Sequence, residues 1–317
     1  MTTPSAPSPS GTGITVRGLT KTFGSFTAVD DLSFEVAPAR VTGFLGPNGA
    51  GKTTTLRMLL GLVRPTAGEA LIGGRRYADL PAPMSTVGAA LEATGFHPGR
   101  SGRNHLRVLA ASHGIPDRRV DELLDLVGIP AAARKKAGGY SMGMRQRLGL
   151  AAALLGDPDV LLLDEPANGL DPEGIRWMRG FMRHLAQEQG KTVLVSSHLL
   201  GEVEQTVEDV VIIANGRMAR QGTIDELRGE PAVLVRVGDP AALARVLQEA
   251  GLEVQPQDGG LRVSGADAAR VGEAAHAAGH PVHELRPLRT DLERLFLELT
   301  ESPEHRNRNL ATGTEAA

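Results

Sequence analysis

The chain has 317 residues, 41% of which are apolar, and its formal net charge is −3. This length is enough for one to three domains and a sizeable core, and the nearly balanced charge gives no general attraction to nucleic acid. Because the sequence contains no cysteine, a disulfide framework, a thiolate nucleophile and a cysteine-ligated metal site are excluded, and the cytosol is the natural compartment.

Both ends of the chain are rich in small and polar residues. Residues 1–13 have neither the basic start nor the apolar core of a signal peptide, and we expect them to be disordered, like the tail at 301–317. The longest apolar run, "LGLAAALLG" at 148–156, has about half of the roughly 18 residues that a membrane-spanning helix needs. We therefore expect a chain that does not cross a membrane by itself.

Strand and helix patterns alternate from residue 14 to residue 228. Strands are predicted at 14–18, 32–36, 41–45, 159–166 and 191–198, helices from Lys52, within about 100–156 and at 175–190, and an Asn-Gly hairpin at 209–222. The strands at 159–166 and 191–198 are apolar almost throughout. Continuous apolar strands separated by helices indicate a parallel sheet that is covered on both faces.

The pattern changes after "RGEP" at 228–231. Strands are predicted at 232–237, 252–256, 260–264 and 281–286, helices at 240–250 and 266–279, and a final amphipathic helix at 290–300. The order βαββαβ is that of the ferredoxin-like split unit. We therefore expect residues 232–300 to form a separate small α+β domain of ferredoxin-like fold.

The segment "GPNGAGKT" at 46–53 has the spacing G-x-x-x-x-G-K-[ST] of a phosphate-binding loop, and it lies between a predicted strand and a predicted helix. Its glycines let successive backbone N–H groups point at phosphate oxygens, and the helix N-terminus adds its dipole. Lys52 would reach the β- and γ-phosphates, and the Thr53 hydroxyl would bind Mg²⁺. The alternative is an ordinary glycine-rich turn, which the match of strand, loop and helix makes the weaker interpretation.

Two acids end the apolar run "LLLDEP" at 161–166. Because neighbouring residues on a strand point to opposite sides, Asp164 could hold Mg²⁺ through water while Glu165 orients or deprotonates an attacking water. Alone, such a pair is more typical of a solvated strand end, but together with the phosphate-binding loop the functional interpretation is favoured. His198 ends the next buried strand, where it is either a hydrogen-bonded core residue or, as we favour, a group near the γ-phosphate.

Four motifs in this order, "GPNGAGKTT", "YSMGM", "LLLDEP" and "SSH", resemble the nucleotide-binding domain of ABC transporters over about residues 14–228. The resemblance implies a P-loop NTPase α/β fold with a RecA-like parallel-sheet core and a helical subdomain at about 88–156. It places Phe23 of "KTFG" against adenine, for which core packing is the alternative, and makes Asp171 of "NGLD" the acid of the D-loop. ATP and Mg²⁺ are the implied ligands. The loop residues expected to contact the nucleotide are Gly46, Pro47, Asn48, Gly49, Ala50, Gly51, Lys52, Thr53 and Thr54.

The segment "YSMGM" stands where the family has its signature Leu-Ser-Gly-Gly-Gln. The resemblance implies a head-to-tail homodimer in which Ser141 and the N–H groups near Gly143 cap the γ-phosphate held by the other copy. Met142 and Met144 replace the family's Gly and Gln. A second departure concerns the loop that joins the helical subdomain, where the family usually carries Gln. Here the stretch 87–106 offers Glu92, a carboxylate that can still ligate Mg²⁺ or water.

The resemblance implies the ATPase subunit of an exporter, located at the cytoplasmic face of the membrane through a permease encoded separately, with no nucleic-acid partner. The "YS-x-GM" pattern and the C-terminal "DLERLFLELT" resemble ATPases of bacterial drug- and antibiotic-resistance exporters. The main alternative is a soluble ABC ATPase that acts on ribosomes or DNA; such proteins commonly have two cassettes or a long coiled coil, whereas this sequence has one phosphate-binding loop and no sustained heptads. A metabolic kinase would not explain "YSMGM".

Overall fold

The computed structural model describes residues 11–91, 95–229, 231–288 and 292–301. They group into two units. The first unit contains the chain up to Gly222 and the chain from Phe296 onward, and the second contains Thr223–Leu295. The first division therefore falls before the expected boundary at 228–232, and the second falls within α11 (Leu292–Glu301).

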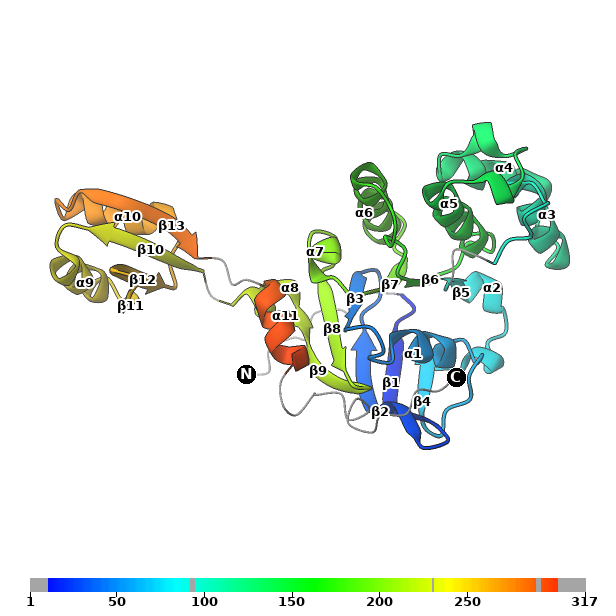
Figure 1. Cartoon of the computed structure of the whole chain (residues 1–317), viewed down its shortest axis with the longest axis horizontal. Helices are drawn as coiled ribbons and strands as arrows, with labels where there is room; N and C mark the ends of the chain where they lie inside the picture. The colour runs from blue at the N-terminus through cyan, green and yellow to red at the C-terminus, as the bar shows by residue number, and fades with distance from the viewer. Residues whose placement is uncertain (1–10, 92–94, 230, 289–291, 302–317) are drawn as a thin grey trace, which may run out of the picture. The chain divides into compact units, whose positions relative to one another are not determined.

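A six-stranded sheet with the order β5-β6-β7-β3-β8-β9 forms the centre of the first unit (Figure 1). Its strands are β3 (Val41–Leu45), β5 (Val87–Ala90), β6 (Val160–Asp164), β7 (Thr192–Ser197), β8 (Asp209–Ala214) and β9 (Arg217–Thr223). The first five of these strands pair in parallel. The Asn215-Gly216 turn, with φ of 49° and 79°, joins β8 to β9, which confirms the predicted hairpin.

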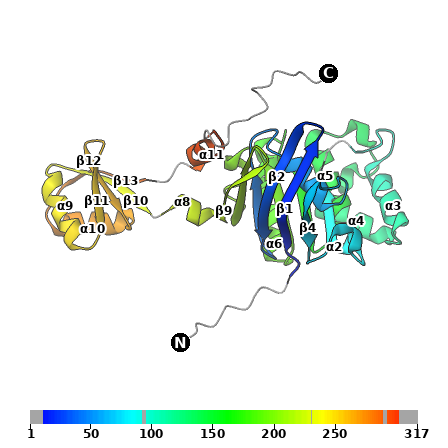
Figure 2. The ribbon, with the colours of Figure 1, turned by 90° about the horizontal axis from the view of Figure 1, so that it is seen from below.

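A second, antiparallel sheet has the order β2-β1-β4 (Figure 2). Its strands are β1 (Ile14–Phe23), β2 (Phe26–Val36) and β4 (Ala67–Ile72). The strands expected at 14–18 and 32–36 are thus present but longer, and they lie outside the parallel sheet. The rings of Phe34 on β2 and Phe44 on β3 lie 5.3 Å apart within one buried apolar cluster, so that burial of apolar area holds the two sheets together.

Helices pack on both sheets of this unit. The first helix, α1 (Lys52–Leu59), contacts β2, β4 and β6, and α6 (Pro172–Gln187) contacts β3 and β7. The short helix α2 (Pro83–Thr86) contacts β5, and the short helix α7 (Leu200–Val203) contacts β7. Because the strands between them are buried on both faces, the prediction of a covered parallel sheet is confirmed.

Three mutually contacting helices form the helix-rich stretch of the first unit: α3 (Gly102–Ser112), α4 (Asp117–Leu126) and α5 (Met142–Ala153). Short 3₁₀ turns lie at Tyr77–Asp79, Pro130–Ala132 and Ala137–Gly139. The buried faces of α3 and α4 repeat at helical spacing, through Leu106 and Ala110 on α3 and Val120 and Leu124 on α4.

The second unit carries a four-stranded antiparallel sheet with the order β11-β12-β10-β13. Its elements are α8 (Ile224–Arg228), β10 (Ala232–Val237), α9 (Pro240–Glu249), β11 (Glu253–Gln257), β12 (Gly260–Ser264), α10 (Ala268–Ala277) and β13 (Val282–Leu288). Val233 and Val235 of the central strand β10 share a buried cluster with Leu243 and Leu247 of α9 and Val271 of α10. The unit therefore has a core of its own.

Candidate nucleotide-binding site

The loop from Gly46 to Gly51 joins β3 to α1, which begins at Lys52 as predicted. Gly51, with a φ of 102°, is the N-cap of α1. Because glycine has no side chain to cap the helix, it leaves the N–H groups of the first turn available to a ligand. A Cβ on Gly51 would lie 2.6 Å from the Ala28 carbonyl oxygen, and one on Gly46 would lie 2.5 Å from that of Ile213. Only glycine fits at these two positions, and the result is a helix N-terminus suited to an anion.

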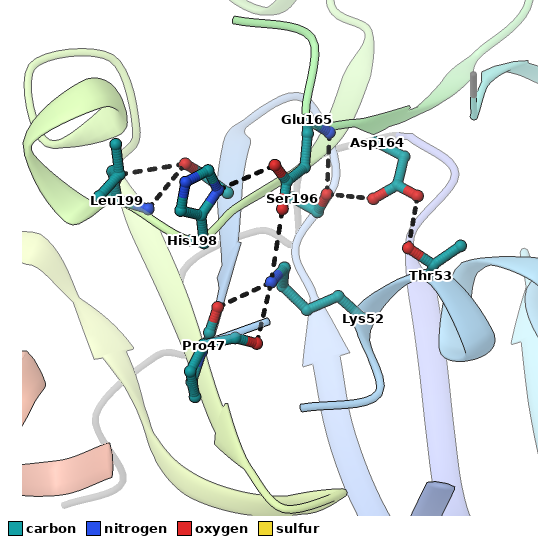
Figure 3. A network of polar contacts seen from close by, with 10 residues as sticks. Pro47, Lys52, Thr53, Asp164, Glu165, Ser196, His198 and Leu199 are labelled. Carbon is teal, nitrogen blue, oxygen red and sulfur yellow. Dashed lines mark hydrogen bonds and ion pairs between the residues drawn. The ribbon is translucent and has the colours of Figure 1, made fainter. Parts of the chain in front are cut away.

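Lys52 is only 5% exposed although it carries an ammonium group. Its Nζ donates hydrogen bonds to the carbonyl oxygens of Gly46, at 2.7 Å, and Pro47, at 3.2 Å, and lies 3.5 Å from Glu165 Oε1 (Figure 3). Burial lowers the pKa of Lys52, and the nearby Glu165 carboxylate acts in the opposite direction. The loop thus folds around a poorly hydrated cation, which is a suitable partner for phosphate oxygens.

Thr53 and Asp164 bring two oxygen ligands together beside the loop. The Thr53 hydroxyl donates to Asp164 Oδ2 at 2.7 Å, and the Ser196 hydroxyl donates to Asp164 Oδ1. A hydroxyl and a carboxylate are hard oxygen donors of the kind that Mg²⁺ prefers when phosphate and water complete its shell. No cluster of three or more His, Cys, Asp or Glu side chains suited to a metal ion occurs within the described ranges, so protein side chains there do not form a complete metal cage.

Glu165 follows β6 with a φ of 47°, in the left-handed region that non-glycine residues rarely adopt. Its N–H donates to Ser196 Oγ at 3.0 Å, and its Oε2 lies 2.8 Å from Nδ1 of His198 (Figure 3). The Glu165 carboxylate therefore lies between the side chains of Lys52 and His198. Such backbone strain costs about 1–3 kcal/mol and is concentrated at functional sites, where surrounding contacts maintain it.

The other expected site residues lie in several places. Pro47, Asn48 and Gly49 are exposed at the loop tip, Ala50 is buried, and Thr54 lies in the first turn of α1. The Phe23 ring is 48% exposed at the end of β1, with Lys21 Nζ 4.8 Å from its centroid, so core packing is excluded. Glu92 lies outside the described residues.

Ser141 and Asp171 are both helix N-caps. Ser141 Oγ accepts from the Met144 N–H at 3.3 Å at the start of α5, and Asp171 Oδ1 accepts from the Gly174 N–H at 2.8 Å at the start of α6. Gly143 lies in the first turn of α5, and Met142 beside it is 45% exposed. Within the described residues, neither N-cap side chain joins the network around Glu165. The structure therefore brings Lys52, Thr53, Asp164, Glu165 and His198 together and leaves Ser141 on a separate helix start.

Comparison with known proteins agrees with this geometry. Residues 29–168 match the model of the ABC transporter family. The chain is 43% identical over 217 residues to the bacitracin transport ATP-binding protein BcrA of Bacillus licheniformis, which covers 68% of this chain and 71% of that protein. The chain belongs to the ATP-binding proteins of ABC transporters. It is an ABC transporter ATPase, with the P-loop α/β core of that family.

Other similar proteins support the family. The daunorubicin resistance ATP-binding protein DrrA3 of Streptomyces coeruleorubidus is 38% identical over 224 residues, which are 69% of this chain and 71% of that protein. A solved ATP-binding subunit of an ABC transporter superimposes with a TM-score of 0.61 at 29% identity, over 68% of this chain and 91% of the other. Residues 231–293 of this ABC ATPase match a separate domain family of unknown function. Among its described helices, none is both long and apolar enough to cross a bilayer.

One functional side chain of this ABC ATPase was missed by the sequence analysis. Ser196 contacts both the Asp164 carboxylate and the Glu165 N–H. A signal was available, because Ser196 and Ser197 are hydroxyl residues at the end of an otherwise apolar strand, next to His198. The left-handed backbone of Glu165 has no comparable sequence signal, since glutamate rarely adopts it.

Proposed function

We propose that this ABC ATPase drives export of a small molecule through a separately encoded membrane permease, as a homodimer that closes on MgATP and reopens after hydrolysis. The observation that carries the proposal is the split of the site: the phosphate loop, Glu165 and His198 form one network, while Ser141 stands on another helix start. A second copy would supply the missing helix N-terminus. Two solved ABC cassettes that are described as dimers have TM-scores of 0.61 at 22% and 23% identity, which shows a shared fold.

In the proposed reaction each residue group has a distinct task. Lys52 and the N–H groups of α1 bind the β- and γ-phosphates, while Phe23 stacks on the base. Thr53 and Asp164 would hold Mg²⁺, which neutralises charge on the β- and γ-phosphates. Glu165 takes the proton of the water that attacks the γ-phosphorus, as the bond to the ADP oxygen breaks.

The surrounding residues prepare this chemistry. His198 orients the Glu165 carboxylate through the 2.8 Å contact. Ser141 and the N–H groups near Gly143, from the second copy, cap the γ-phosphate, and Asp171 fixes the D-loop by capping α6. Glu92 is a further proposed ligand of Mg²⁺ or water.

Export is proposed from the names of two relatives, the bacitracin transport protein BcrA and the daunorubicin resistance protein DrrA3. Another solved relative, cbiO1 of Clostridium perfringens, is part of the ABC transporter complex cbiONQ. It is 25% identical, with a TM-score of 0.60 over 68% of this chain and 89% of that chain. Through such a permease, the chain would act at the cytoplasmic face of the membrane. We also infer that β10 to β13 with α9 and α10 form a ferredoxin-like domain, which the strand order β11-β12-β10-β13 supports.

A transport assay tests the proposal. The chain is co-expressed in bacteria with a membrane protein encoded beside it, and accumulation of bacitracin and of daunorubicin is measured. We expect the pair to lower accumulation of at least one compound and Lys52→Ala in the same pair to restore it, because Lys52 is buried in the phosphate loop. Purified chain whose ATPase is stimulated by ribosomes or DNA, but not by the membrane protein in lipid vesicles, would instead support the ribosome- or DNA-acting alternative.

A further inference from the structure

The turn that carries Ser141 lies close to the turn that carries Asp171. A Cβ placed on Gly169 would lie 3.4 Å from Cγ of Met142, and one placed on Gly143 would lie 3.6 Å from Cδ2 of Leu170. These distances place the start of α5 close to the loop before α6. The helix start that the proposed dimer would present to a second nucleotide is therefore a neighbour of the Asp171 helix start in the same chain.

A second contact joins the same two helices further along their length. Arg147 is six residues after Ser141 on α5, and Trp177 is six residues after Asp171 on α6. The Arg147 guanidinium carbon lies 3.8 Å from the centre of the Trp177 ring, and Trp177 stacks on Phe181 with centroids 5.0 Å apart. This is a cation–π contact at close range, and it joins α5 to α6 beyond the point where their starts lie close together.

Arg147 also reaches a third helix. Its Nη1 donates to the carbonyl oxygen of Val127, at the C-cap of α4, at 2.8 Å. The next residue, Gly128, has a φ of 72°, and a Cβ there would lie 2.8 Å from that same nitrogen. Burial lowers the pKa of Arg147, while Glu173 and Asp171 on α6 act in the opposite direction. The guanidinium is partly desolvated, which strengthens its attraction to the ring.

We propose that Arg147 and Trp177 are positioning residues that hold the Ser141 turn in a fixed place against α6, so that it reaches the nucleotide of a second copy. This inference rests on the proposed head-to-tail dimer. Neither side chain belongs to the network around Lys52 and Glu165 among the described contacts. Their loss should therefore leave ATP binding to the phosphate loop intact and impair closure and turnover.

Four variants of the full chain test the inference: Arg147→Met, Arg147→Lys, Trp177→Leu and the double variant Arg147→Met/Trp177→Leu. We expect Arg147→Met and Trp177→Leu each to lower kcat about tenfold, within the range for a partly buried cation–π contact. The dissociation constant for MgATP, measured by calorimetry, should stay within about twofold of wild type. The double variant should be no slower than the slower single variant, because the two residues act through one contact.

The chain offers a spectroscopic probe and a matched control. Trp177 is the only tryptophan in the sequence, so its emission reports directly on the ring beneath Arg147. Arg147→Met should shift that emission to longer wavelength and raise its quenching by acrylamide, since one face of the ring becomes accessible. Arg183→Met removes the same charge from an exposed position on α6, and we expect its kcat and Trp177 emission to equal those of wild type.

The outcomes separate this inference from the proposed function. Folded Arg147→Met with wild-type kcat and wild-type ATP-dependent dimerisation overturns it, and so does a double variant whose loss of kcat is the product of the two single losses. If Arg147→Met does not fold, Trp177→Leu decides, because it removes the same contact from the other side: lowered kcat at unchanged MgATP affinity supports the inference, and wild-type kcat overturns it. Arg147→Lys, whose ammonium can also lie over the ring, should lose less activity than Arg147→Met. Wild-type chain that binds MgATP but never dimerises overturns the proposed function and this inference together.

Discussion

His198 Nδ1 and Glu165 Oε2 lie 2.8 Å apart, although the two residues belong to different strand ends. Asp164 of β6 pairs in register with Ser196 of β7, so Glu165 and His198 leave the sheet at the same edge. Glu165 has a left-handed backbone, and its N–H donates a hydrogen bond to the Ser196 hydroxyl. These two features fix the direction in which its side chain extends from the end of β6. The side chain that we propose as the base is therefore oriented by the neighbouring strand.

Removing this contact should slow hydrolysis and leave nucleotide affinity largely unchanged. We expect His198→Ala to lower kcat by about 10²-fold, the lower end of what a positioned general base contributes, because Glu165 loses the contact that orients it, with a MgATP dissociation constant within about threefold of wild type. Phosphate release and calorimetry measure the two quantities. His184→Ala is the matched control, because His184 Nδ1 contacts Glu188 at 3.0 Å on α6 in a similar pair outside the site. Wild-type kcat in folded His198→Ala would show that His198 does not orient the base.

The shared site can be tested by mixing two inactive chains. Glu165→Gln keeps the shape of the side chain but removes the base, so it should bind ATP and accumulate as a closed dimer. Ser141→Arg should block closure by its bulk. In a mixed dimer, one site combines the intact Glu165 of the Ser141→Arg chain with the intact Ser141 of the Glu165→Gln chain, and part of the ATPase activity should return.

Phosphate release from mixed dimers isolated with two different tags measures the recovery. The control mixes either variant with the double variant, where no site is whole and no activity should appear. Full activity of wild-type chain held strictly as a monomer would rule out a site shared between copies.

The second unit should be dispensable for nucleotide binding. Residues 232–288 have their own antiparallel sheet and buried cluster, whereas every residue of the Lys52 network lies before Gly222. We expect a chain that ends at residue 229 to bind MgATP within about threefold of the full chain, as measured by calorimetry. A truncated chain that is folded by circular dichroism and yet fails to bind would show that residues after 229, in the second unit or in α11, support the site.

His105 on α3 makes stability depend on pH. The side chain is 8% exposed, its Nδ1 has no hydrogen-bond partner, and its ring meets the Phe96 ring edge-on at 4.8 Å. Burial, with a smaller contribution from Arg100, lowers the pKa of His105 below its usual 6.5. The unfolded chain therefore binds the proton more readily, and the free energy of unfolding should fall as the pH drops below about 6.5.

Denaturant titrations at pH 7.5 and pH 5.5 measure this effect. Between pH 7.5 and pH 5.5, the free energy of unfolding of wild type should fall relative to that of His105→Leu, by at most about 1.4 kcal/mol per pH unit. His113→Gln, at the exposed end of the same helix, is the control for replacing a histidine on α3. An equal difference at both pH values would mean that His105 titrates alike in the folded and unfolded chains.

The sequence by itself determined the parts of the site that are local in the chain. The loop 46–51 and the start of α1 at Lys52 are encoded in contiguous residues, because glycines at fixed positions permit a backbone that other residues would strain. The apolar runs of β6 and β7 likewise predicted buried parallel strands, since a strand covered on both faces needs apolar residues at every position. The resemblance to ABC transporters rests on these same contiguous motifs.

Only the tertiary structure decided which distant residues meet. Strand register places Ser196 beside Asp164, and packing places Trp177 beneath Arg147, thirty residues away in the chain. Strands β1 and β2 were predicted, but their separate antiparallel sheet depends on pairing with β4, which their own alternation does not encode. The positive φ of Glu165 runs against its local preference and is maintained by contacts from β7 and α1, so that no local pattern could have predicted it.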